Sequence, residues 1–336
     1  MRLGAIRAAA WAALGVGVAA PVLRRRLPAP PAVAQATAFA APVALCVAVP
    51  RSRRRDVATC ALQMWAYLAL YKTPHDDAAQ QARQVRIDYP IVLDRALGLG
   101  ELPTVRLQRA LAEADRWTAL DRVLVWSHWT WFFVPHGTLL YIMFRHPERF
   151  DRAAVMTYAV FDLGASVYWV LPTAPPWYAA TVQGEVADAP DRGEALAALA
   201  ERVGDPGRHG ADSKAILAVR RMMVEYGEHF WKERWGPLYE VLGGNPLAAM
   251  PSLHFATSLM AAQLLSECGP GPGALGWAYA LTLGFSLVYL GEHYVVDLLG
   301  GAAVTAVVRR FGPRAEPALR AVSGAIGQLE RLAASG

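Results

Sequence analysis

The sequence contains few charged residues, few cysteines and hardly any lysine. Of its 336 residues, 18% are charged and 54% are hydrophobic, whereas a soluble domain is typically about 25% charged. Three cysteines cannot all pair with one another, which excludes a disulfide scaffold. Only three of the 33 cationic residues are lysine, and this bias, together with much alanine, indicates a GC-rich bacterial genome. The composition also excludes a disordered chain, a collagen and a coiled coil.

Several signatures of cofactor-dependent enzymes are absent as well. The sequence has no phosphate loop of the form G-x-x-x-x-G-K-[ST] and no H-E-x-x-H zinc motif. Gly98-Leu99-Gly100 is too short for a dinucleotide-binding fingerprint. The acidic pair Asp76-Asp77 lacks the further carboxylates that a Mg²⁺ site needs. We therefore expect neither a metal nor another cofactor.

Long apolar runs dominate the sequence that remains. A membrane-spanning helix needs about 20 mostly apolar residues. Six segments qualify, namely 56–72, 123–144, 153–171, 251–268, 274–290 and 294–311, and two weaker, alanine-rich ones are 5–22 and 31–50. The pattern predicts an all-α, polytopic membrane protein with a six-helix core and one or two extra N-terminal helices. Segment 5–22 could instead be a signal-peptide hydrophobic region, although the arginines directly after it favour an uncleaved anchor.

The positions of the arginines predict how the chain is oriented. Clusters at 51–55, 145–152 and 309–314 fall on one face when the spans alternate, and the positive-inside rule makes that face cytoplasmic. Because these clusters adjoin apolar runs, they indicate a membrane protein rather than one that binds nucleic acid. The cluster Arg24–Arg26 breaks the alternation, which predicts that one of the two N-terminal segments does not span fully. Polar residues at the far ends of the core spans are then extracytoplasmic.

These assignments divide the chain into three parts. The expected parts are N-terminal membrane anchor helices at 1–55, a catalytic membrane core at 56–312 and a cytoplasmic tail at 313–336. Two long extracytoplasmic segments belong to the core, at 73–122 and 172–250. The first has the pattern of an amphipathic interfacial helix, and the second has helix-like stretches near 190–203 and 212–232.

Two motifs that could carry chemistry stand at the ends of a predicted helical hairpin. The run 269–273, which alternates glycine and proline, ends a helix and joins the spans on either side of it as antiparallel neighbours. His254 opens one arm and His293 follows the other, so we expect the two imidazoles to lie close together. His293 and Asp297 have the i, i+4 spacing of helix neighbours. A carboxylate behind an imidazole fixes its tautomer and makes the other ring nitrogen a base or a nucleophile.

The segment before His254 has the character of an anion site. Pro251 is suited to the first turn of a helix, where unpaired N–H groups and the Ser252 hydroxyl could bind a phosphate. A bound phosphate would keep His254 protonated, as a general acid requires. One alternative is that these residues only cap helices at the membrane interface. Another is a zinc site with the possible ligands His254, Glu292, His293 and Asp297. His128 and His136 lie among tryptophans and are expected to be satisfied histidines of an aromatic belt.

Three stretches of the sequence resemble a known family. They are PTAPPWY at 172–178, NPLAAMPSLHFA at 245–256 and GEHYVVDLLGG at 291–301. This set resembles the type 2 phosphatidic acid phosphatase superfamily, and most of all its inositolphosphorylceramide synthase-like branch. The resemblance covers roughly residues 56–312 and implies metal-independent phosphoryl transfer through a phosphohistidine. It implies that His293 attacks phosphorus, that Asp297 orients it, that His254 protonates the leaving group and that Ser252 contacts phosphate.

The sequence departs from the broad superfamily pattern in its cations. Residues 173–178 contain no lysine or arginine, and Ser286 is followed by Leu287 where an arginine is usual. Outer-face cations must then stabilise the phosphoryl group, and the candidates are Arg83, Arg86, Arg220, Arg221, Lys232 and Arg234. The expected phosphate-binding residues are Ser252, Leu253, Lys232, Arg234, Arg220 and Arg221, and the expected substrate-lining residues are Pro176, Trp177, Tyr178 and Tyr294.

The sequence thus predicts a multi-pass plasma-membrane enzyme with an extracytoplasmic active site and lipid substrates. It would move a phospho-head-group of the inositol phosphate type from a phospholipid to a hydroxyl acceptor. A lipid-phosphate phosphatase with the same site is the first alternative, because water can replace the acceptor. A proton-coupled transporter with His254 and His293 as relay groups is an alternative of another class. No feature indicates an oligomeric state.

Overall fold

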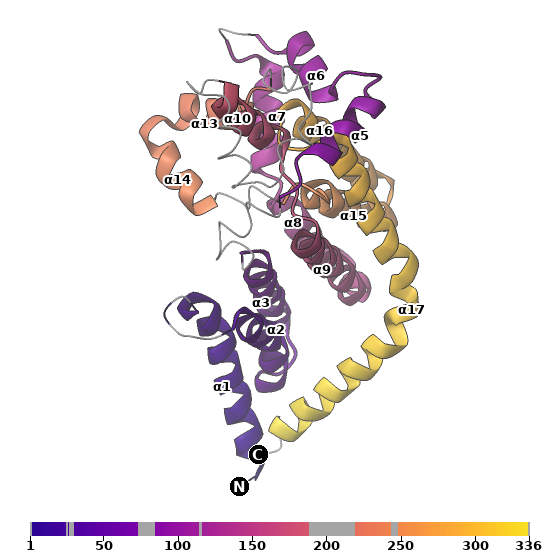
Figure 1. Cartoon of the computed structure of the whole chain (residues 1–336). Helices are drawn as coiled ribbons and strands as arrows, with labels where there is room; N and C mark the ends of the chain where they lie inside the picture. The colour runs from indigo at the N-terminus through magenta and orange to yellow at the C-terminus, as the bar shows by residue number, and fades with distance from the viewer. Residues whose placement is uncertain are drawn as a thin grey trace.

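The protein is built almost entirely of α-helices (Figure 1). The computed structural model describes residues 2–24, 26, 30–72, 85–113, 116–187, 219–242 and 248–334. Within these ranges there is no β-strand, and the only extended pairings are two isolated bridges of Thr173, with Arg86 and with Ala248. The predicted all-α class is confirmed.

Three N-terminal helices pack beside one another at the end of the molecule that carries both termini (Figure 1). They are α1 (Arg2–Leu23), α2 (Pro31–Ala48) and α3 (Arg53–Lys72). Alanines at their contacts, including Ala38, Ala66 and Ala69, are nearly or fully buried and allow close approach of the backbones. The arginines before α3 join this end to the rest of the molecule, since Arg51 forms an ion pair with Asp151 at 2.7 Å.

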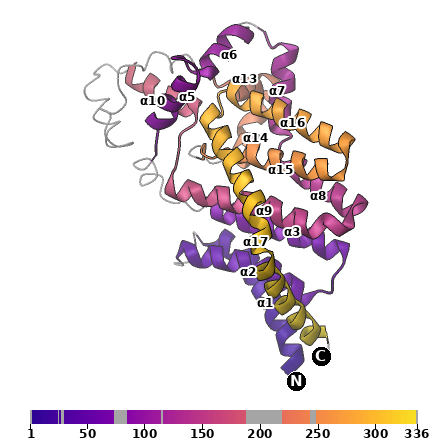
Figure 2. The same ribbon diagram turned by 90° about the vertical axis from the view of Figure 1, so that its right-hand side faces the viewer.

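The core bundle contains most of the remaining helices. It comprises α7 (Ala119–Trp129), α8 (Phe133–Arg145), α9 (Pro147–Val170), α15 (Leu253–Cys268), α16 (Pro270–Tyr289) and the first half of α17 (Val295–Ala334). Figure 2 shows α9, α15, α16 and α17 lying together in this bundle. Fully buried Phe161, Ala256 and Met260 belong to its main hydrophobic cluster.

Three helices in the described part of the chain are long and apolar enough to cross a membrane by themselves. They are Gly4–Leu23 within α1, α2, and α9. The other predicted spans exist as helices but are shorter or more polar; α15, for example, has 16 residues. The length and apolar character of these helices fit a membrane protein.

The hairpin of α15 and α16 turns more tightly than predicted. The chain breaks only at Gly269, whose φ of +144° is unfavourable for other residues, and α16 begins at Pro270 rather than at 274. Pro270 and Pro272 stand in the first turn of α16, where a helix needs no backbone N–H donor. The expected five-residue turn at 269–273 is therefore wrong, although the hairpin itself is present.

The span predicted at 123–144 is two helices instead of one. Pro135 has no N–H group with which to continue the hydrogen-bond ladder to Trp131. The chain instead makes tighter bonds, from the N–H of Trp131 to the carbonyl of His128 and from the N–H of Val134 to the carbonyl of Trp131. This break separates α7 from α8 and lets the Trp131 indole N–H donate to Thr257 of α15 at 2.9 Å.

Helix α17 continues well past its predicted end at residue 311. It includes Pro313 and Pro317 and runs to Ala334, so the expected separate tail is the second half of one helix. Both prolines are exposed, and carbonyl groups that lose an N–H partner there can bind water. The last turn packs against α1 and α2, where Ala333 is buried with Ala10 and Val47.

Short helices cover the end of the bundle that is farthest from the termini (Figure 1). They are α5 (Asp88–Leu97), α6 (Pro103–Leu111), α10 (Pro176–Ala187), α13 (Met222–Trp231), the 3₁₀-helix η3 (Lys232–Arg234) and α14 (Trp235–Leu242). The amphipathic helix expected within 73–122 is thus the pair α5 and α6, as far as that segment is described. The helix-like stretch near 190–203 lies outside the described residues, and of the stretch 212–232 only residues 219–232 are described, where α13 is found.

The arginine clusters predicted to share a face gather at the other end of the bundle. Glu267, near the end of α15, forms ion pairs with Arg152 at 2.6 Å and with Arg309 at 2.5 Å, and accepts a hydrogen bond from Arg149 at its carbonyl. His254 is at the opposite end of the same helix, about 20 Å away at 1.5 Å per residue. The bundle therefore separates its basic end from the end that carries the two histidine motifs.

Candidate active site

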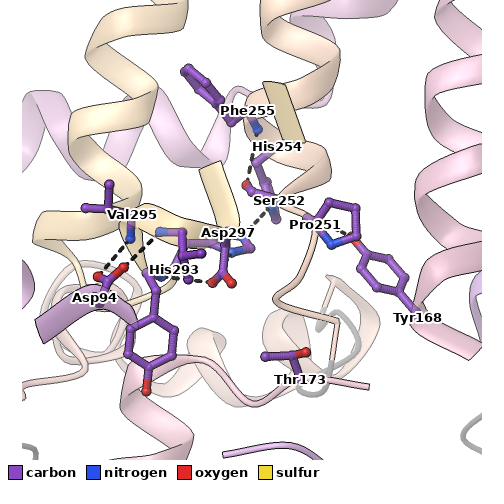
Figure 3. A network of polar contacts seen from close by, with 12 residues as sticks. Asp94, Tyr168, Thr173, Pro251, Ser252, His254, Phe255, His293, Val295 and Asp297 are labelled. Atoms are coloured by element: carbon purple, nitrogen blue, oxygen red, sulfur yellow. Dashed lines mark hydrogen bonds and ion pairs between the residues drawn. The ribbon is translucent and has the colours of Figure 1, made fainter. Parts of the chain in front are cut away.

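Three side chains from the two histidine motifs form a continuous hydrogen-bonded chain (Figure 3). The Nδ1 atom of His254 lies 3.2 Å from Nε2 of His293, and Nδ1 of His293 lies 3.3 Å from Oδ2 of Asp297. The side chains of His293 and Asp297 are almost inaccessible, at 5% and 0% exposure. The hairpin thus brings the two histidines together, as the sequence predicts.

The order of donors and acceptors in this chain follows from the carboxylate. An ionised Asp297 can only accept, so Nδ1 of His293 carries a hydrogen and Nε2 keeps a lone pair. That lone pair accepts from Nδ1–H of His254. The arrangement leaves Nε2 of His293 as the atom that can attack an electrophile, with Asp297 behind it.

The first turns of α15 and α17 are bonded to each other through Ser252 and Asp297. The N–H of Ser252 donates to the backbone carbonyl of Asp297 at 2.9 Å, and the Asp297 carboxylate accepts the N–H of Tyr294 at 2.9 Å. Ser252 is the N-cap of α15, because its hydroxyl accepts the N–H of Phe255 at 3.3 Å. The expectation that Pro251 stands in the first turn is wrong, since Pro251 precedes this cap and its carbonyl accepts from Tyr168 at 2.8 Å.

Gly301 of α17 permits this close approach to α15. A Cβ atom at Gly301 would lie 2.5 Å from the carbonyl oxygen of Ser252 and 3.3 Å from the backbone nitrogen of Ala256. A real Cβ atom essentially never shows a contact under 3.0 Å, so the first of these two distances excludes a side chain unless the backbone shifts. Gly301, the last residue of the motif GEHYVVDLLGG, therefore sets the separation of α15 and α17 on which the contact of the two histidines depends.

The segment between α16 and α17, residues 290–294, is here called the His293 loop. Gly291 in this loop has a φ of +79°, which favours glycine, and its carbonyl accepts the N–H of Trp177 at 3.2 Å. Gln108 of α6 donates from Nε2 to the carbonyls of Tyr289 at 2.9 Å and Arg220 at 3.0 Å. On the other side, Asp94 of α5 accepts backbone N–H groups at the start of α17. The loop is thus bonded to α5, α6 and α10 at its end of the bundle.

The four cations predicted to bind phosphate occupy different environments. The Arg221 guanidinium carbon stacks 3.5 Å from the ring centre of Trp177, the residue whose N–H bonds to the His293 loop. Arg220 forms an ion pair with Glu225 at 2.5 Å and lies over Trp117. Lys232 and Arg234 are exposed on η3. Arg221 is therefore the one that these contacts connect most directly to the loop.

Of the other two cation candidates and the acidic pair, only Arg86 belongs to the described residues. Arg86 is exposed, and its backbone pairs with Thr173 and Pro172. Arg83 and Asp76-Asp77 lie outside the described residues. Among the described residues, no group of three or more histidine, cysteine or acidic side chains could hold a metal ion.

The predicted substrate-lining residues differ in how far they are buried. Trp177 and Tyr178 are partly buried in the first turn of α10, which begins at the buried Pro176. Tyr294 is fully buried in a hydrophobic cluster with Ala174 and Ala179. Glu292, beside Arg221, is half-buried, and its burial raises the pKa of its carboxyl although the Arg221 charge opposes this.

Leu253 and Ser252 are both buried at the start of α15. Leu253 is 3% exposed and packs against Gly164 of α9, where only a glycine leaves room for its side chain. Its backbone belongs to the first turn, whose N–H groups have no acceptor within the helix.

His128 is a site residue that sequence reasoning assigns only to the aromatic belt. Its ring centre is 4.9 Å from that of His254. The ring of Trp131 also packs on His254, with the two ring centres 4.2 Å apart. His136 is only partly satisfied, because its Nδ1 donates to the carbonyl of Phe132 at 2.7 Å while its buried Nε2 has no hydrogen-bond partner. The local sequence pattern does not show which of the two histidines belongs to the site. The break between α7 and α8 decides this, because it determines which histidine lies against His254 of α15.

Comparison with known proteins yields a single family. A model of the PAP2 superfamily matches residues 91–310, a range that begins in α5 and includes His254, His293 and Asp297. No curated protein and no solved structure matches the chain.

Proposed function

The chain belongs to the PAP2 superfamily, whose members are phosphatases or phosphotransferases that act on phosphate esters, and we propose that it is an integral-membrane lipid phosphotransferase. It would transfer a phospho-head-group of the inositol phosphate type from a phospholipid to a hydroxyl acceptor. The observation that carries this proposal is the chain of contacts from His254 through His293 to Asp297. The same site would hydrolyse a lipid phosphate when water is the acceptor.

In the first half-reaction, Nε2 of His293 forms a bond to phosphorus while the bond from phosphorus to the leaving oxygen breaks. His254 gives a proton to that oxygen, which departs as an alcohol. The hydrogen on Nδ1 of His293 stays in its bond to Asp297, whose negative charge stabilises the positive phosphoimidazolium. A phosphohistidine is thereby formed with no proton left unassigned.

In the second half-reaction, an acceptor hydroxyl attacks the same phosphorus and the bond to Nε2 of His293 breaks. His254, now neutral, takes the proton of the hydroxyl and returns to its starting state. Because His293 is 4% exposed, water has little access to the phosphohistidine, which supports transfer to a bound acceptor over hydrolysis.

The developing negative charge on the phosphoryl oxygens needs cations and N–H donors. We assign this role to Arg221, to the N–H groups of the first turn of α15 at Leu253, and to the Ser252 position. Arg220, Lys232 and Arg234 are secondary candidates, because the Arg220 guanidinium is paired with Glu225 and the other two side chains are exposed on η3. The site would be extracytoplasmic, because the arginine clusters at the other end of the bundle favour the cytoplasm.

The test is incubation of the purified chain with a panel of phospholipids and lipid phosphates in EDTA, followed by mass spectrometry of the products. We expect a new phospholipid when a hydroxyl acceptor is supplied, inhibition by vanadate, and free phosphate or head-group phosphate without an acceptor. His293→Ala should abolish the reaction, and Asp297→Asn should slow it by about 10⁴-fold.

The matched control is His146→Ala, which changes a histidine between α8 and α9 at the basic end of the bundle. This variant should retain wild-type activity. A His293→Ala protein as active as wild type, or a reaction lost in EDTA and restored by a divalent metal, would remove the proposal.

A further inference from the structure

Asp94 is a fully buried carboxylate that the proposed reaction does not use. It stands in α5 and is 0% exposed. Its Oδ2 atom accepts the N–H of Val295 at 2.9 Å, and its Oδ1 atom accepts the N–H of Val296 at 2.8 Å (Figure 3). Both carboxylate oxygens are therefore bound to the first turn of α17, two and three residues after His293.

These two bonds are stronger than ordinary backbone contacts. The first N–H groups of a helix have no acceptor within it, and the positive end of the helix attracts negative charge. Asp94 therefore supplies both a negative charge and two acceptor oxygens. Hydrogen bonds to an ionised group are about twice as strong as those between neutral groups. Together with Asp297, which binds the N–H of Tyr294, it satisfies three successive donors at this point.

These two hydrogen bonds connect α5, which is distant in the sequence, to the backbone just after His293. Asp94 and Val295 are separated by 201 residues. Gln108 holds the other end of the His293 loop at Tyr289, and Trp177 binds it in the middle at Gly291. Both ends of the loop that carries His293 are therefore bonded to helices other than α16 and α17.

We propose that Asp94 is a positioning residue, which holds the start of α17 so that His293 keeps the orientation needed to attack phosphorus. It contacts neither His293 nor the reacting atoms by hydrogen bonds and acts through the backbone of Val295 and Val296. This inference rests on the proposed function, because it names the residue that positions its nucleophile.

Two substitutions in the full-length purified protein separate this role from general stability. Asp94→Ala removes both acceptors, and Asp94→Asn keeps the shape and one acceptor but loses the charge. We expect kcat to fall by about 100-fold in Asp94→Ala, the size of effect that a 1 Å displacement of a catalytic group produces. The fall should be smaller in Asp94→Asn, and KM for the lipid donor should not change in either variant.

A second measurement, hydrogen–deuterium exchange, needs no activity. The amides of Val295 and Val296 should exchange faster in Asp94→Ala, while those in the middle of α16 should not change. The control variant is Asp162→Asn, which alters a half-buried carboxylate of α9 that accepts from Gln63 at 2.8 Å. It should affect neither exchange at Val295 and Val296 nor kcat.

The outcomes are distinct from those that test the proposed function. If His293→Ala is as active as wild type, the proposed function fails, and exchange alone still decides whether Asp94 holds the start of α17. Wild-type kcat in Asp94→Ala overturns the positioning role, whether exchange rises or not. A loss of kcat without faster exchange at Val295 and Val296 overturns it too. If Asp94→Ala does not fold, Asp94→Asn is judged by the same criteria.

Discussion

His254 and His293 are bonded directly to each other, with Nδ1 of the first 3.2 Å from Nε2 of the second. The proposed acid and the proposed nucleophile thus face the same point, and a phosphoryl group that enters between them replaces one hydrogen bond with two contacts. The two residues are 39 positions apart in the chain. Their contact depends on the hairpin, on Gly301 of α17 and on the bonds that fix the His293 loop.

The leaving group should decide how much His254 matters. In His254→Gln the first half-reaction lacks its acid, so a donor with an alkoxide leaving group should react about 10²–10⁴-fold more slowly than with wild type. A donor with an aryloxide leaving group, which departs without protonation, should lose much less in that step. Stopped-flow measurement of leaving-group release checks this. An equal loss for both donors would contradict the assignment of His254 as the acid.

His128 should support His254 by packing rather than by proton transfer. Its ring lies 4.9 Å from that of His254, and an aromatic replacement can fill the same space. We expect His128→Phe to stay close to wild type and His128→Ala to lose about tenfold in kcat, or about 1.4 kcal/mol in the barrier. Steady-state kinetics of the two variants provides the measurement. If Phe is as damaging as Ala, a nitrogen of His128 is required and the packing account is wrong.

Two glycines of one helix provide a matched pair for the α15–α17 contact. Gly301→Ala places a methyl group against the Ser252 carbonyl, so it should destabilise the protein by about 1–3 kcal/mol and lower activity by moving α17 away from His254. Gly312→Ala meets nothing within 4 Å and should be neutral or stabilising by up to about 1 kcal/mol. Thermal unfolding in detergent and kcat are measured for both. Equal behaviour of the two variants would show that the close approach has no consequence.

Asp94 should make stability depend on pH in a defined direction. Burial raises the pKa of Asp94 to about 6, and the neighbouring Asp297 charge adds to this, although the N–H groups of Val296 and Val295 act in the opposite direction. The folded protein therefore holds the Asp94 proton more tightly than the unfolded chain does, because the Asp94 carboxyl has a pKa of about 3.9 in the unfolded chain. The stabilising contribution of this group is complete below about pH 4 and is lost as the pH rises through about 6.

The Asp94→Asn protein lacks that titration. The difference in Tm between wild type and variant should therefore move in favour of the variant from pH 4 to pH 6, roughly, and stay constant at higher pH. Asp151→Asn, which alters an exposed carboxylate, is the control. Parallel Tm curves for wild type and Asp94→Asn between these pH values would contradict the account.

The sequence predicts those features of the fold that depend on local patterns. Apolar length indicates the helices, the run at 269–273 indicates the hairpin, and the i, i+4 spacing of His293 and Asp297 indicates their contact. The contact of the two histidines could be predicted because the two arms of a short helical hairpin must end close to each other. The predicted grouping of the arginines follows equally from where they stand relative to the spans.

Features that depend on contacts between distant segments could not be predicted in this way. Asp94 looks like an ordinary acidic residue of an amphipathic helix, and only the packing of α5 on α17 gives it two backbone donors. His128 and His136 have the same local surroundings in sequence, yet only His128 precedes the break between α7 and α8, and it lies against His254. Pro313 and Pro317 suggest in the sequence that the helix ends there. Helix α17 continues past them, because both are exposed and the carbonyl groups that lose an N–H partner can bind water.

The central claim, that His293 carries the transferred group, is tested most directly by trapping it. The purified protein is mixed with the reactive phospholipid donor in EDTA, quenched at alkaline pH within the first turnover, digested and examined by mass spectrometry. The account predicts a donor-derived phosphoryl group on the histidine of the peptide that contains His293, present in wild type and absent from Asp297→Asn on the same time scale. Product formation with no modified His293 at any time in the first turnover would contradict it.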